Sequence, residues 1–477
     1  MDEIKVAFLD DGLNMSLLSE MEKVDLYAVE DGEVILCSNI NRGHEITHGT
    51  ICVKIFKQFV KIKANIISIE ILDYNKRCSS DKLVVALNWI EQMGIKIVNL
   101  SLGTSFFGDE MCLKRCVNKL ADSGHIIVAA QNNNSFITYP ATFTNVIGVS
   151  ASHENQDILL NTEYVFSGID LLGKSEHEID MQGNKIVTQH ASSFATPYIT
   201  AMVANLYKPG DDVLDMKHKL CLTFCDGFLE LKKYDWCNKA IIVQSRNCNF
   251  EKDYVCFEVI KRYYFDEIEF KIEEIKILYK QNIIKTLIII GNGENIIHLL
   301  KGEKVRFPYL LMINTNNEIL LSKMNNLERT LIIKDLNLKK IFSNEKIKKL
   351  DIPIVVIYYN EQKENEAICR ICKAKEDFAD NGYNCKTFID KSVGVLYSFE
   401  YWTGEFDIRE YIEFYMIDLV VILINMNKKN GYIDGDLNLR FGQSEVFSEI
   451  NMLFDVEDKD IYQYTVEQLQ EENNKYE

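Results

Sequence analysis

The sequence predicts an α/β fold: a doubly wound parallel sheet with helices on both faces, followed by a separate C-terminal α/β region. Two observations predict this fold. In the first part of the chain, apolar runs of strand length alternate with longer segments whose apolar residues recur at helical spacing. The strand-length runs are almost continuously apolar, which is typical of parallel strands covered on both faces. Further strand–helix–strand signals return in the second half, so more than one domain is expected.

The predicted elements of residues 1–208 alternate between strand and helix. Segment 5–9 is an apolar strand, and segment 49–60 repeats apolar residues at intervals of three and four, as a helix with one buried face requires. Glycines end two of the later helices. The remaining expected elements are a strand at 64–72, a helix at 80–93, a strand at 95–102, a helix at 112–123, strands at 125–130 and 146–150, and a helix at 193–206.

The second half is less regular. The segment Lys-Pro-Gly-Asp-Asp at 208–212 marks the expected exit from the first domain. Two strong strand signals follow at 283–290 and 352–359. The second leads into a helix at 361–381 and a strand at 385–389, and segment 419–424 is a candidate for a further strand. The sequence therefore predicts a domain at 1–208, an α/β domain at 209–345 and an α/β domain at 346–477 that ends in an acidic tail.

Composition limits the partners and the location of the protein. Acidic residues outnumber basic ones, 71 to 53, for a net charge of −18, so neither nucleic acid nor an anionic membrane is an expected partner. No apolar stretch reaches the roughly 18 residues of a membrane-spanning helix, and the first residues lack the basic start and apolar run of a secretory signal. The 13 cysteines have no disulfide-framework spacing, which is typical of a reduced, cytoplasmic protein.

Four short segments bring potentially reactive side chains to the edges of predicted elements. Asp10 ends a strand, and Asn132 follows another buried strand. His48 and Ser193 each stand at the beginning of a helix. The segments read V-A-F-L-D-D-G at 6–12, T-H-G-T at 47–50, V-A-A-Q-N at 128–132 and S-S-F-A-T-P at 192–197. Because the carboxyl ends of parallel strands share one edge of a sheet, Asp10 and Asn132 are expected on the same side.

These residue types suit nucleophilic catalysis. A serine hydroxyl is a weak nucleophile until a base takes its proton, and His48 can do this near neutral pH. A buried carboxylate, here Asp10, fixes the imidazole tautomer and stabilises the imidazolium that forms. An amide donor beside the serine, here Asn132, stabilises the developing oxyanion. The chain order acid, base, nucleophile is one of the known orders for this chemistry.

In this order the segments resemble those of the subtilisin-like serine proteases, the subtilase family, over residues 4–207. The resemblance implies a subtilisin-like fold for this region and a serine endopeptidase activity. It implies that Asp10, His48 and Ser193 form the catalytic triad and that Asn132 contributes the oxyanion hole. No cofactor and no metal are expected. No acidic cluster in the first 208 residues has the spacing of calcium ligands, although the sequence leaves a calcium requirement open.

A further motif concerns the substrate. Ser101, Leu102 and Gly103 match the S-L-G motif of the family, which implies that they bind substrate as an added strand. Tyr-Pro-Ala at 139–141 matches the motif that follows the oxyanion asparagine in the family. The expected partner is therefore a peptide or protein substrate.

Residues of the same type lie next to two of these candidates. The spacing of the family motif S-x-A-x-P selects Ser193 over Ser192, whose expected role is helix capping. Asn133 and Asn134 compete with Asn132, and turn formation is their expected role.

Three positions depart from the family pattern. Asp11 replaces a serine or threonine, and a second acid there is expected to raise the pKa of Asp10 or to reorient it. Gln131 replaces a glycine and is expected to alter one edge of the specificity pocket. Ala-Ser at 191–192 replaces Gly-Thr before the nucleophile. The domain is also short for the family, so surface loops and calcium-binding loops are expected to be trimmed.

Two functional hypotheses follow. The first is a dedicated intracellular peptide-processing serine endopeptidase, such as one that matures a ribosomally made peptide. The motif begins within ten residues of Met1, which leaves no room for a folding pro-segment, and residues 209–477 would engage a specificity partner or choose the substrate. The alternative is a catalytically degenerate subtilase that acts as a protein- or peptide-binding scaffold through its C-terminal half.

Overall fold

The computed structural model divides the chain into two compact units, Met1–Asn238 and Lys239–Glu477. It describes residues 3–18, 24–37, 46–73, 75–153, 157–162, 165–225, 233–246, 250, 252–281, 284–291, 307, 309–313, 330–401, 407–426, 433–441, 454–456 and 460–473. No helix within these ranges is both long enough and apolar enough to cross a bilayer.

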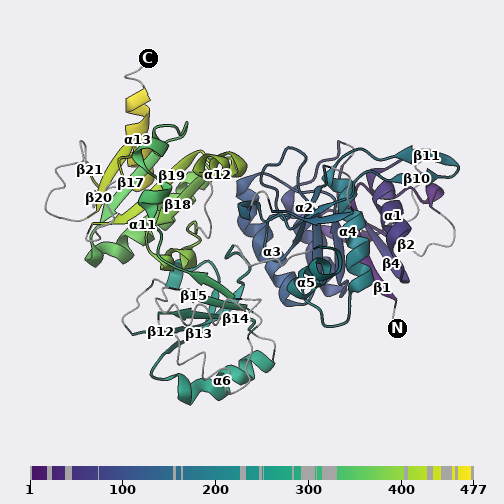
Figure 1. The fold of residues 1–477 in the computed structure, drawn as a ribbon, viewed down its shortest axis with the longest axis horizontal. Helices are drawn as coiled ribbons and strands as arrows, with labels where there is room; N and C mark the ends of the chain where they lie inside the picture. The colour runs from purple at the N-terminus through teal and green to yellow at the C-terminus, as the bar shows by residue number, and fades with distance from the viewer. Residues whose placement is uncertain are drawn as a thin grey trace. The chain divides into compact units, whose positions relative to one another are not determined.

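The first unit is built on a nine-stranded sheet in the order β3-β2-β4-β1-β5-β6-β7-β9-β8 (Figure 1). All strand pairs from β2 to β9 are parallel, and the outermost strands β3 and β8 pair antiparallel. The strands are β1 Ile4–Asp10, β2 Val24–Glu30, β3 Glu33–Leu36, β4 Ala64–Glu70, β5 Ile97–Leu100, β6 Ile126–Ala130, β7 Ile147–Ala151, β8 Ile158–Leu160 and β9 Leu171–Gly173. A separate antiparallel hairpin joins β10 Glu178–Met181 and β11 Asn184–Val187.

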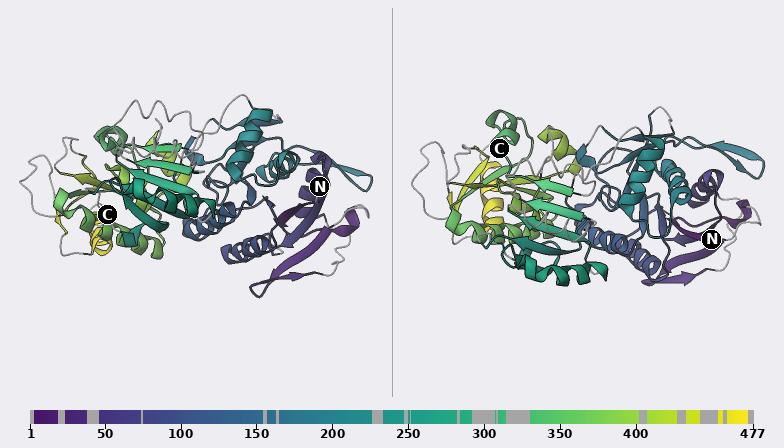
Figure 2. Two further views of the ribbon diagram at one scale, coloured as in Figure 1. Left: turned by 90° about the horizontal axis from the view of Figure 1, so that it is seen from below. Right: turned by 60° about the horizontal axis from the view of Figure 1, so that its bottom comes forward.

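Helices cover both faces of this sheet (Figure 2). They are α1 His48–Phe59, α2 Ser80–Gln92, α3 Glu110–Asp122, α4 Ser192–Leu206 and α5 Val213–Phe224. Side chains from α1, α4 and α5 form one buried cluster with Val6 and Phe8 of β1. Ala7 and Leu9 are also fully buried, and they point to the opposite face because successive strand side chains alternate. Burial on both faces explains why β1 is apolar at every central position, and it confirms the doubly wound parallel fold.

The second unit contains two five-stranded sheets, and every strand pair described in them is parallel. The first sheet has the order β13-β12-β14-β15-β16, a common doubly wound order, and the second has the order β18-β19-β17-β20-β21. The expected C-terminal α/β region is therefore confirmed. Its strands are β12 Lys239–Gln244, β13 Glu258–Tyr264, β14 Thr286–Ile290, β15 Tyr309–Ile313, β16 Thr330–Ile333, β17 Ile354–Tyr359, β18 Cys385–Ile389, β19 Leu419–Asn425, β20 Leu437–Phe441 and β21 Phe454–Asp455. Its helices are α6 Ile268–Lys280, α9 Leu338–Ile341, α10 Asn344–Ile347, α11 Glu364–Asp380, α12 Ile408–Tyr415 and α13 Ile461–Asn473.

The first compact unit reaches well past residue 208. Helix α5 lies in the same buried cluster as α4, and Trp236 is 2% exposed. The buried ammonium of Lys217 on α5 lies 2.8 Å from an Asp170 carboxylate oxygen, just before β9. The division into domains at 1–208, 209–345 and 346–477 stays a proposal, while α5 and Trp236 are buried within the first compact unit.

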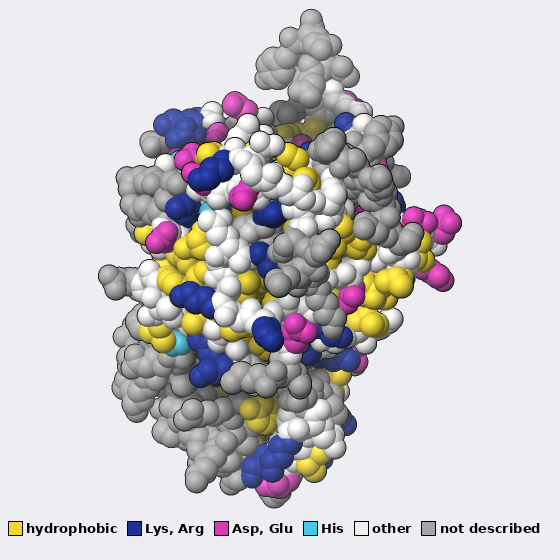
Figure 3. Space-filling model, turned by 90° about the vertical axis from the view of Figure 1, so that its right-hand side faces the viewer, with side chains coloured by type: hydrophobic (Ala, Val, Ile, Leu, Met, Phe, Trp, Pro, Cys, Tyr) yellow, Lys and Arg dark blue, Asp and Glu magenta, His cyan; other side chains and the backbone are white. Residues whose placement is uncertain are grey.

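Figure 3 shows one face of the molecule, on which Lys and Arg side chains lie between hydrophobic and acidic ones. The basic side chains on this face are scattered and do not form a single stripe.

Candidate active site

The candidate acid and base lie side by side at one edge of the first sheet. Asp10 is the last residue of β1 and is 3% exposed, and His48 is the first residue of α1. The His48 Nδ1 atom lies 3.0 Å from Asp10 Oδ1 and 2.9 Å from Oδ2. The backbone N–H of Asp11 donates to Asp10 Oδ1 at 2.9 Å. The carboxylate is therefore fixed from two sides.

The candidate nucleophile faces the other imidazole nitrogen. Ser193, in the first turn of α4, places its Oγ 3.0 Å from His48 Nε2. The Phe194 ring packs beside the imidazole, with the two ring centroids 5.1 Å apart. Ser193 as a residue is partly exposed. The structure thus brings together the acid, base and nucleophile that the sequence analysis selected.

Local sequence explains how α1 begins at His48. The N-cap residue Thr47 accepts a hydrogen bond from the Thr50 amide at 3.2 Å and donates its own hydroxyl proton to the Gly12 carbonyl at 2.9 Å. Gly49 lies so close to the strand end that a Cβ atom there would be 2.6 Å from the Gly12 oxygen. The H-G-T motif therefore needs its glycine to let the helix approach β1.

Asp11 holds the start of α1. Its carboxylate accepts the backbone N–H of His48 at 3.0 Å and that of Gly49 at 2.8 Å. It therefore caps the first two amides of this helix. Burial and the charge of Asp10 raise the pKa of Asp11, while these two amides oppose that rise.

A cysteine lies beneath the imidazole. Cys52, one turn along α1 and fully buried, has its Sγ 3.6 Å from His48 Nδ1. One potential ligand atom each from Asp10, His48 and Cys52 lies within 4.8 Å of the others. A metal ion held there would compete with the Asp10–His48 hydrogen bond.

The pKa of His48 is set by burial and charge. Burial alone would lower the pKa of His48, but the negative charge of Asp10 and the hydrogen bonds with Asp10 and Cys52 raise it above its ordinary value. Burial raises the pKa of the Cys52 thiol. The thiol therefore stays protonated at neutral pH, and the Asp10 carboxylate is the partner that stabilises the imidazolium.

The carbonyl of Ser193 explains the position of Ser101. In a helix this carbonyl would accept the N–H of residue 197, but Pro197 has none. Ser101 Oγ donates to it instead at 2.9 Å, and Cys52 Sγ lies 3.7 Å away. Ser101 thus uses its side chain to support the nucleophile, and Asn99 donates to Ser101 Oγ at 3.0 Å.

The loop after β6 is organised by three asparagines. The Oδ1 atom of Asn132 accepts the backbone N–H groups of Asn134 at 3.0 Å and Phe136 at 3.2 Å. This points the amide oxygen into the loop and directs the Nδ2 group away from it. The adjacent Asn133 accepts the backbone N–H of Ser192 at 3.1 Å, so Asn133 joins this loop directly to the helix of the nucleophile.

The segment 101–103 leads away from β5 toward the following loop. Gly103 is exposed and Leu102 is partly buried. The next residue, Thr104, forms an antiparallel bridge with Tyr139 through hydrogen bonds of 2.9 and 2.7 Å. One edge of this segment is therefore occupied by the chain itself.

Sequence reasoning missed several supporting residues. Asn99 is fully buried within the apolar β5, and Thr200 donates to its Oδ1 at 2.9 Å. A lone asparagine in an apolar strand is a signal of such a buried polar network, because an unpaired amide there would be costly. Cys52 and Thr138 carried no comparable sequence signal.

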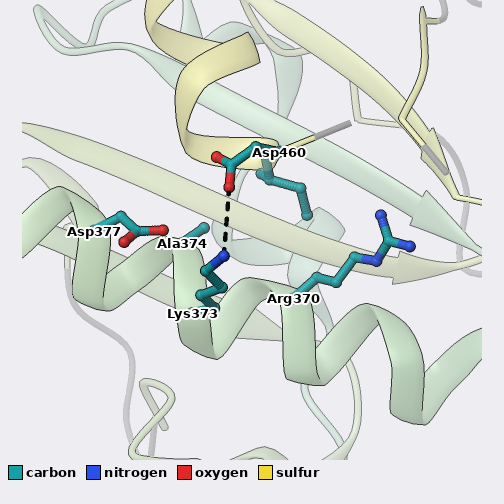
Figure 4. Close-up of a pocket in the computed structure, with 6 residues that line it drawn as sticks. Arg370, Lys373, Ala374, Asp377 and Asp460 are labelled. Atoms are coloured by element: carbon teal, nitrogen blue, oxygen red, sulfur yellow. Dashed lines mark ion pairs between the residues drawn. The ribbon is translucent and has the colours of Figure 1, made fainter. Parts of the chain in front are cut away.

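A pocket in the second unit contains none of the candidate site residues. A cavity of about 230 Å³ lies between α11 and the start of α13 (Figure 4). Lys373 Nζ lies 3.7 Å from Asp460 Oδ2 across it. Arg370, which also lines it, pairs with Glu366 at 3.0 Å. The charged groups of this pocket thus largely neutralise each other.

Comparison with known proteins identifies relatives of the first unit. Residues 2–224 match the model of the subtilase family. Subtilisin BL of Lederbergia lenta is 26% identical over 144 residues, which cover 30% of this chain and 52% of that protein. The minor extracellular protease Epr of Bacillus subtilis (strain 168) is 28% identical over 156 residues, which cover 30% of this chain and 22% of that protein. The chain therefore spans about half, or less, of the length of these relatives.

Two solved structures are similar to less than half of the chain. A cold-adapted subtilisin-like serine proteinase shares 18% identity with a TM-score of 0.35, covering 45% of this chain and 79% of that one. A mutant of the protease domain of PatA shares 20% identity with a TM-score of 0.31, covering 43% of this chain and 78% of that one.

Proposed function

Because residues 2–224 belong to the subtilase family, we propose that this chain is a serine endopeptidase with Ser193 as its nucleophile. The observation that carries the proposal is the position of His48. Its Nε2 lies 3.0 Å from Ser193 Oγ and its Nδ1 lies 2.9 Å from Asp10 Oδ2. A continuous path of hydrogen bonds therefore joins carboxylate, imidazole and hydroxyl, as the triad mechanism requires.

The reaction follows from this geometry. Ser193 Oγ attacks the carbonyl carbon of a peptide bond while its proton passes to His48 Nε2. The C–N bond then breaks, His48 gives the proton to the leaving amine, and an ester to Ser193 remains. Water, deprotonated by His48, hydrolyses the ester and releases the acid product. Asp10 keeps the Nδ1 proton in place and stabilises the imidazolium throughout.

The oxyanion of the tetrahedral intermediate needs donors beside Ser193. We assign one donor to Asn132, because its amide oxygen already accepts two backbone N–H groups of the loop, which leaves the Nδ2 group as the donor to the substrate. The partial positive charge at the start of α4 also stabilises the negative charge of the oxyanion. Loss of one such donor costs about 10²–10³ in rate.

The substrate is proposed to lie extended along Ser101, Leu102 and Gly103. The exposure of Gly103 supports this, because a backbone without a side chain can accept a neighbouring strand closely. Peptide processing in the cytoplasm, with residues 209–477 engaging a specificity partner, is the proposed setting. Its support is the cysteines: the twelve in the described ranges are free thiols, as in a reducing compartment.

The scaffold alternative requires a disrupted triad. A degenerate subtilase would have lost hydrogen-bond reach between His48 and its two partners, and the distances above favour the enzyme. The departure at Asp11 also gives the scaffold alternative less support than the sequence suggested, because the Asp11 carboxylate caps α1.

A fluorophosphonate probe tests the proposal. The intact wild-type chain is expected to gain the mass of one probe, and Ser193→Ala is expected to remain unlabelled. Ser192→Ala is the matched control, since it removes the neighbouring hydroxyl and should keep labelling. Equal labelling of wild type and Ser193→Ala, or no labelling of either, would refute the proposal and leave the scaffold reading.

A further inference from the structure

The structure points to a constriction beside the nucleophile, and we propose that it restricts the substrate to a small residue, Gly, Ala or Ser, immediately before the cleaved bond. This inference rests on the proposed endopeptidase function and names the substrate class of the same site. The observation behind it is the position of Thr138, which contacts Gly103 on one side and Asn132 on the other, the two segments proposed to flank the scissile carbonyl.

The two flanking segments continue neighbouring strands. β5 and β6 pair in parallel, with Leu100 opposite Ala129. Segment 101–103 prolongs β5, and segment 131–132 prolongs β6. A carbonyl carbon attacked by Ser193, with its oxygen toward Asn132, lies above the gap between them. With the substrate backbone along 101–103, the side chain before the cleaved bond enters this gap, since crevices beyond the carboxyl ends of strands are where α/β sheets accept ligands.

Thr138 fills this gap from below. Its side chain is nearly inaccessible, with 3% of the residue exposed. On one side its Oγ1 accepts the backbone N–H of Asn132 at 2.9 Å. On the other side its methyl group lies against Gly103, where a Cβ atom would be only 2.5 Å from Thr138 Cγ2. One side chain thus touches both walls.

The backbone on either side of Thr138 holds it there. Thr138 Oγ1 donates to the Phe136 carbonyl at 3.2 Å. The bridge between Thr104 and Tyr139 fixes the residue that follows. The Tyr139 carbonyl oxygen would also lie 2.8 Å from a Cβ atom on Gly103. Because backbone and side chain both approach Gly103, the constriction cannot open by a change of rotamer alone.

Gln131, where the family has glycine, is 8% exposed and its backbone N–H is bonded to the Val149 carbonyl at 2.8 Å, so the second segment is held to the sheet. Large side chains such as Leu or Phe would have to displace Thr138, at a loss of rate that a small residue does not incur.

Peptidyl phosphonates that differ only in the residue before the reactive phosphorus test this inference on the full chain. Compounds carrying Ala, Leu and Phe at that position are compared by their rates of covalent labelling, followed by intact mass. The wild-type chain is expected to react at least about tenfold faster with the Ala compound, since even one methylene in a tight pocket changes rates by about 10–200-fold.

Two variants separate the effect of side-chain volume at position 138 from the effect of its hydrogen bond to Asn132. Thr138→Ser keeps the Oγ1 acceptor for Asn132 and removes only the methyl group against Gly103, so its preference for Ala over Leu is expected to fall about tenfold. Thr138→Val keeps the volume and loses the acceptor, so it is expected to retain the preference. Should Thr138→Ser not fold, the wild-type rates alone decide.

The outcomes also distinguish this inference from the proposed function. A chain that reacts with a simple fluorophosphonate but prefers Leu or Phe, or reacts with none of the three compounds, keeps its protease assignment and overturns the constriction. An unchanged preference in Thr138→Ser overturns it too. A chain without any reactive serine overturns both.

Discussion

At the scale of the residue, the protonation of His48 decides when Ser193 can be activated. Burial works against the charged imidazole, but Asp10 and the hydrogen bonds around it raise the pKa of His48 above its ordinary value of 6.5. His48 accepts the serine proton only when it is neutral. Labelling by a fluorophosphonate is therefore expected to increase with pH along a limb whose midpoint lies above pH 6.5, measured as the labelling rate of the wild-type chain at a series of pH values.

Asp10→Asn provides the comparison for this pH profile. The amide removes the charge that raises the pKa of His48, so the midpoint should move to lower pH. The maximal rate should fall as well, by about 10⁴, because an amide no longer holds the productive tautomer. A profile with the same midpoint in both proteins would show that Asp10 does not control the base.

At the scale of the element, the start of α1 determines where His48 lies. Asp11 accepts the first two amides of this helix. We expect Asp11→Ala to lower the free energy of unfolding by about 1–2 kcal/mol, as for other lost helix caps. We also expect slower labelling of Ser193, because the backbone of the base loses its anchor. Urea unfolding and labelling rates measured on the same samples check both effects.

A second acidic residue at a helix start is the control. Asp81 lies in the first turn of α2 and is exposed. Asp81→Ala should change stability by less than about 1 kcal/mol through the helix dipole, and it should leave labelling unaltered. Asp11→Ser, which restores the residue type of the family, should recover part of the labelling rate. If Asp11→Ala labels as fast as wild type, then the cap does not position the base.

Elements also show what the sequence could and could not predict. The central strands of the first sheet were predictable because burial on both faces makes them continuously apolar, and their parallel order placed Asp10 and Asn132 on one side of the sheet. The strands β2 and β3 were missed because they are the two outermost strands on one side of that sheet, where most positions stay partly or fully exposed. The C-terminal strand β13 was hidden for the same reason.

The site itself was predictable only where a motif carried it. The three triad candidates lie in family motifs, so the sequence could identify them. The hydrogen bond from Ser101 to the Ser193 carbonyl could not be predicted, because it depends on Pro197 lacking an N–H and on contacts between distant segments. The role of Thr138 depends on how closely it approaches Gly103, a distance that only tertiary packing sets. The effect of Asp11 on Asp10 stays a prediction, whereas its role as a helix cap could not be predicted because it depends on how closely α1 approaches the end of β1.

At the scale of the whole molecule, the first unit has its own core and contains Asp10, His48 and Ser193. Val213, Met216 and Leu220 of α5 belong to that core, and Lys217 on the same helix pairs with Asp170. A fragment of residues 1–238 is therefore expected to fold and to react with a fluorophosphonate at a rate close to that of the full chain. A fragment of residues 1–208 lacks α5 and is expected to be unfolded or aggregated, which circular dichroism and size-exclusion chromatography would show.

The same pair of proteins tests what the second unit does. If residues 239–477 choose the substrate, fragment 1–238 and the full chain should react equally with a fluorophosphonate, which needs only the triad, yet should cleave different subsets of a peptide library. The constriction at Thr138 lies wholly within the first unit, so both proteins should share the preference for a small residue before the cleaved bond. If the two proteins cleave the same peptides, the second unit does not select the substrate. A fragment that folds but does not label would show that the second unit is needed to organise the triad.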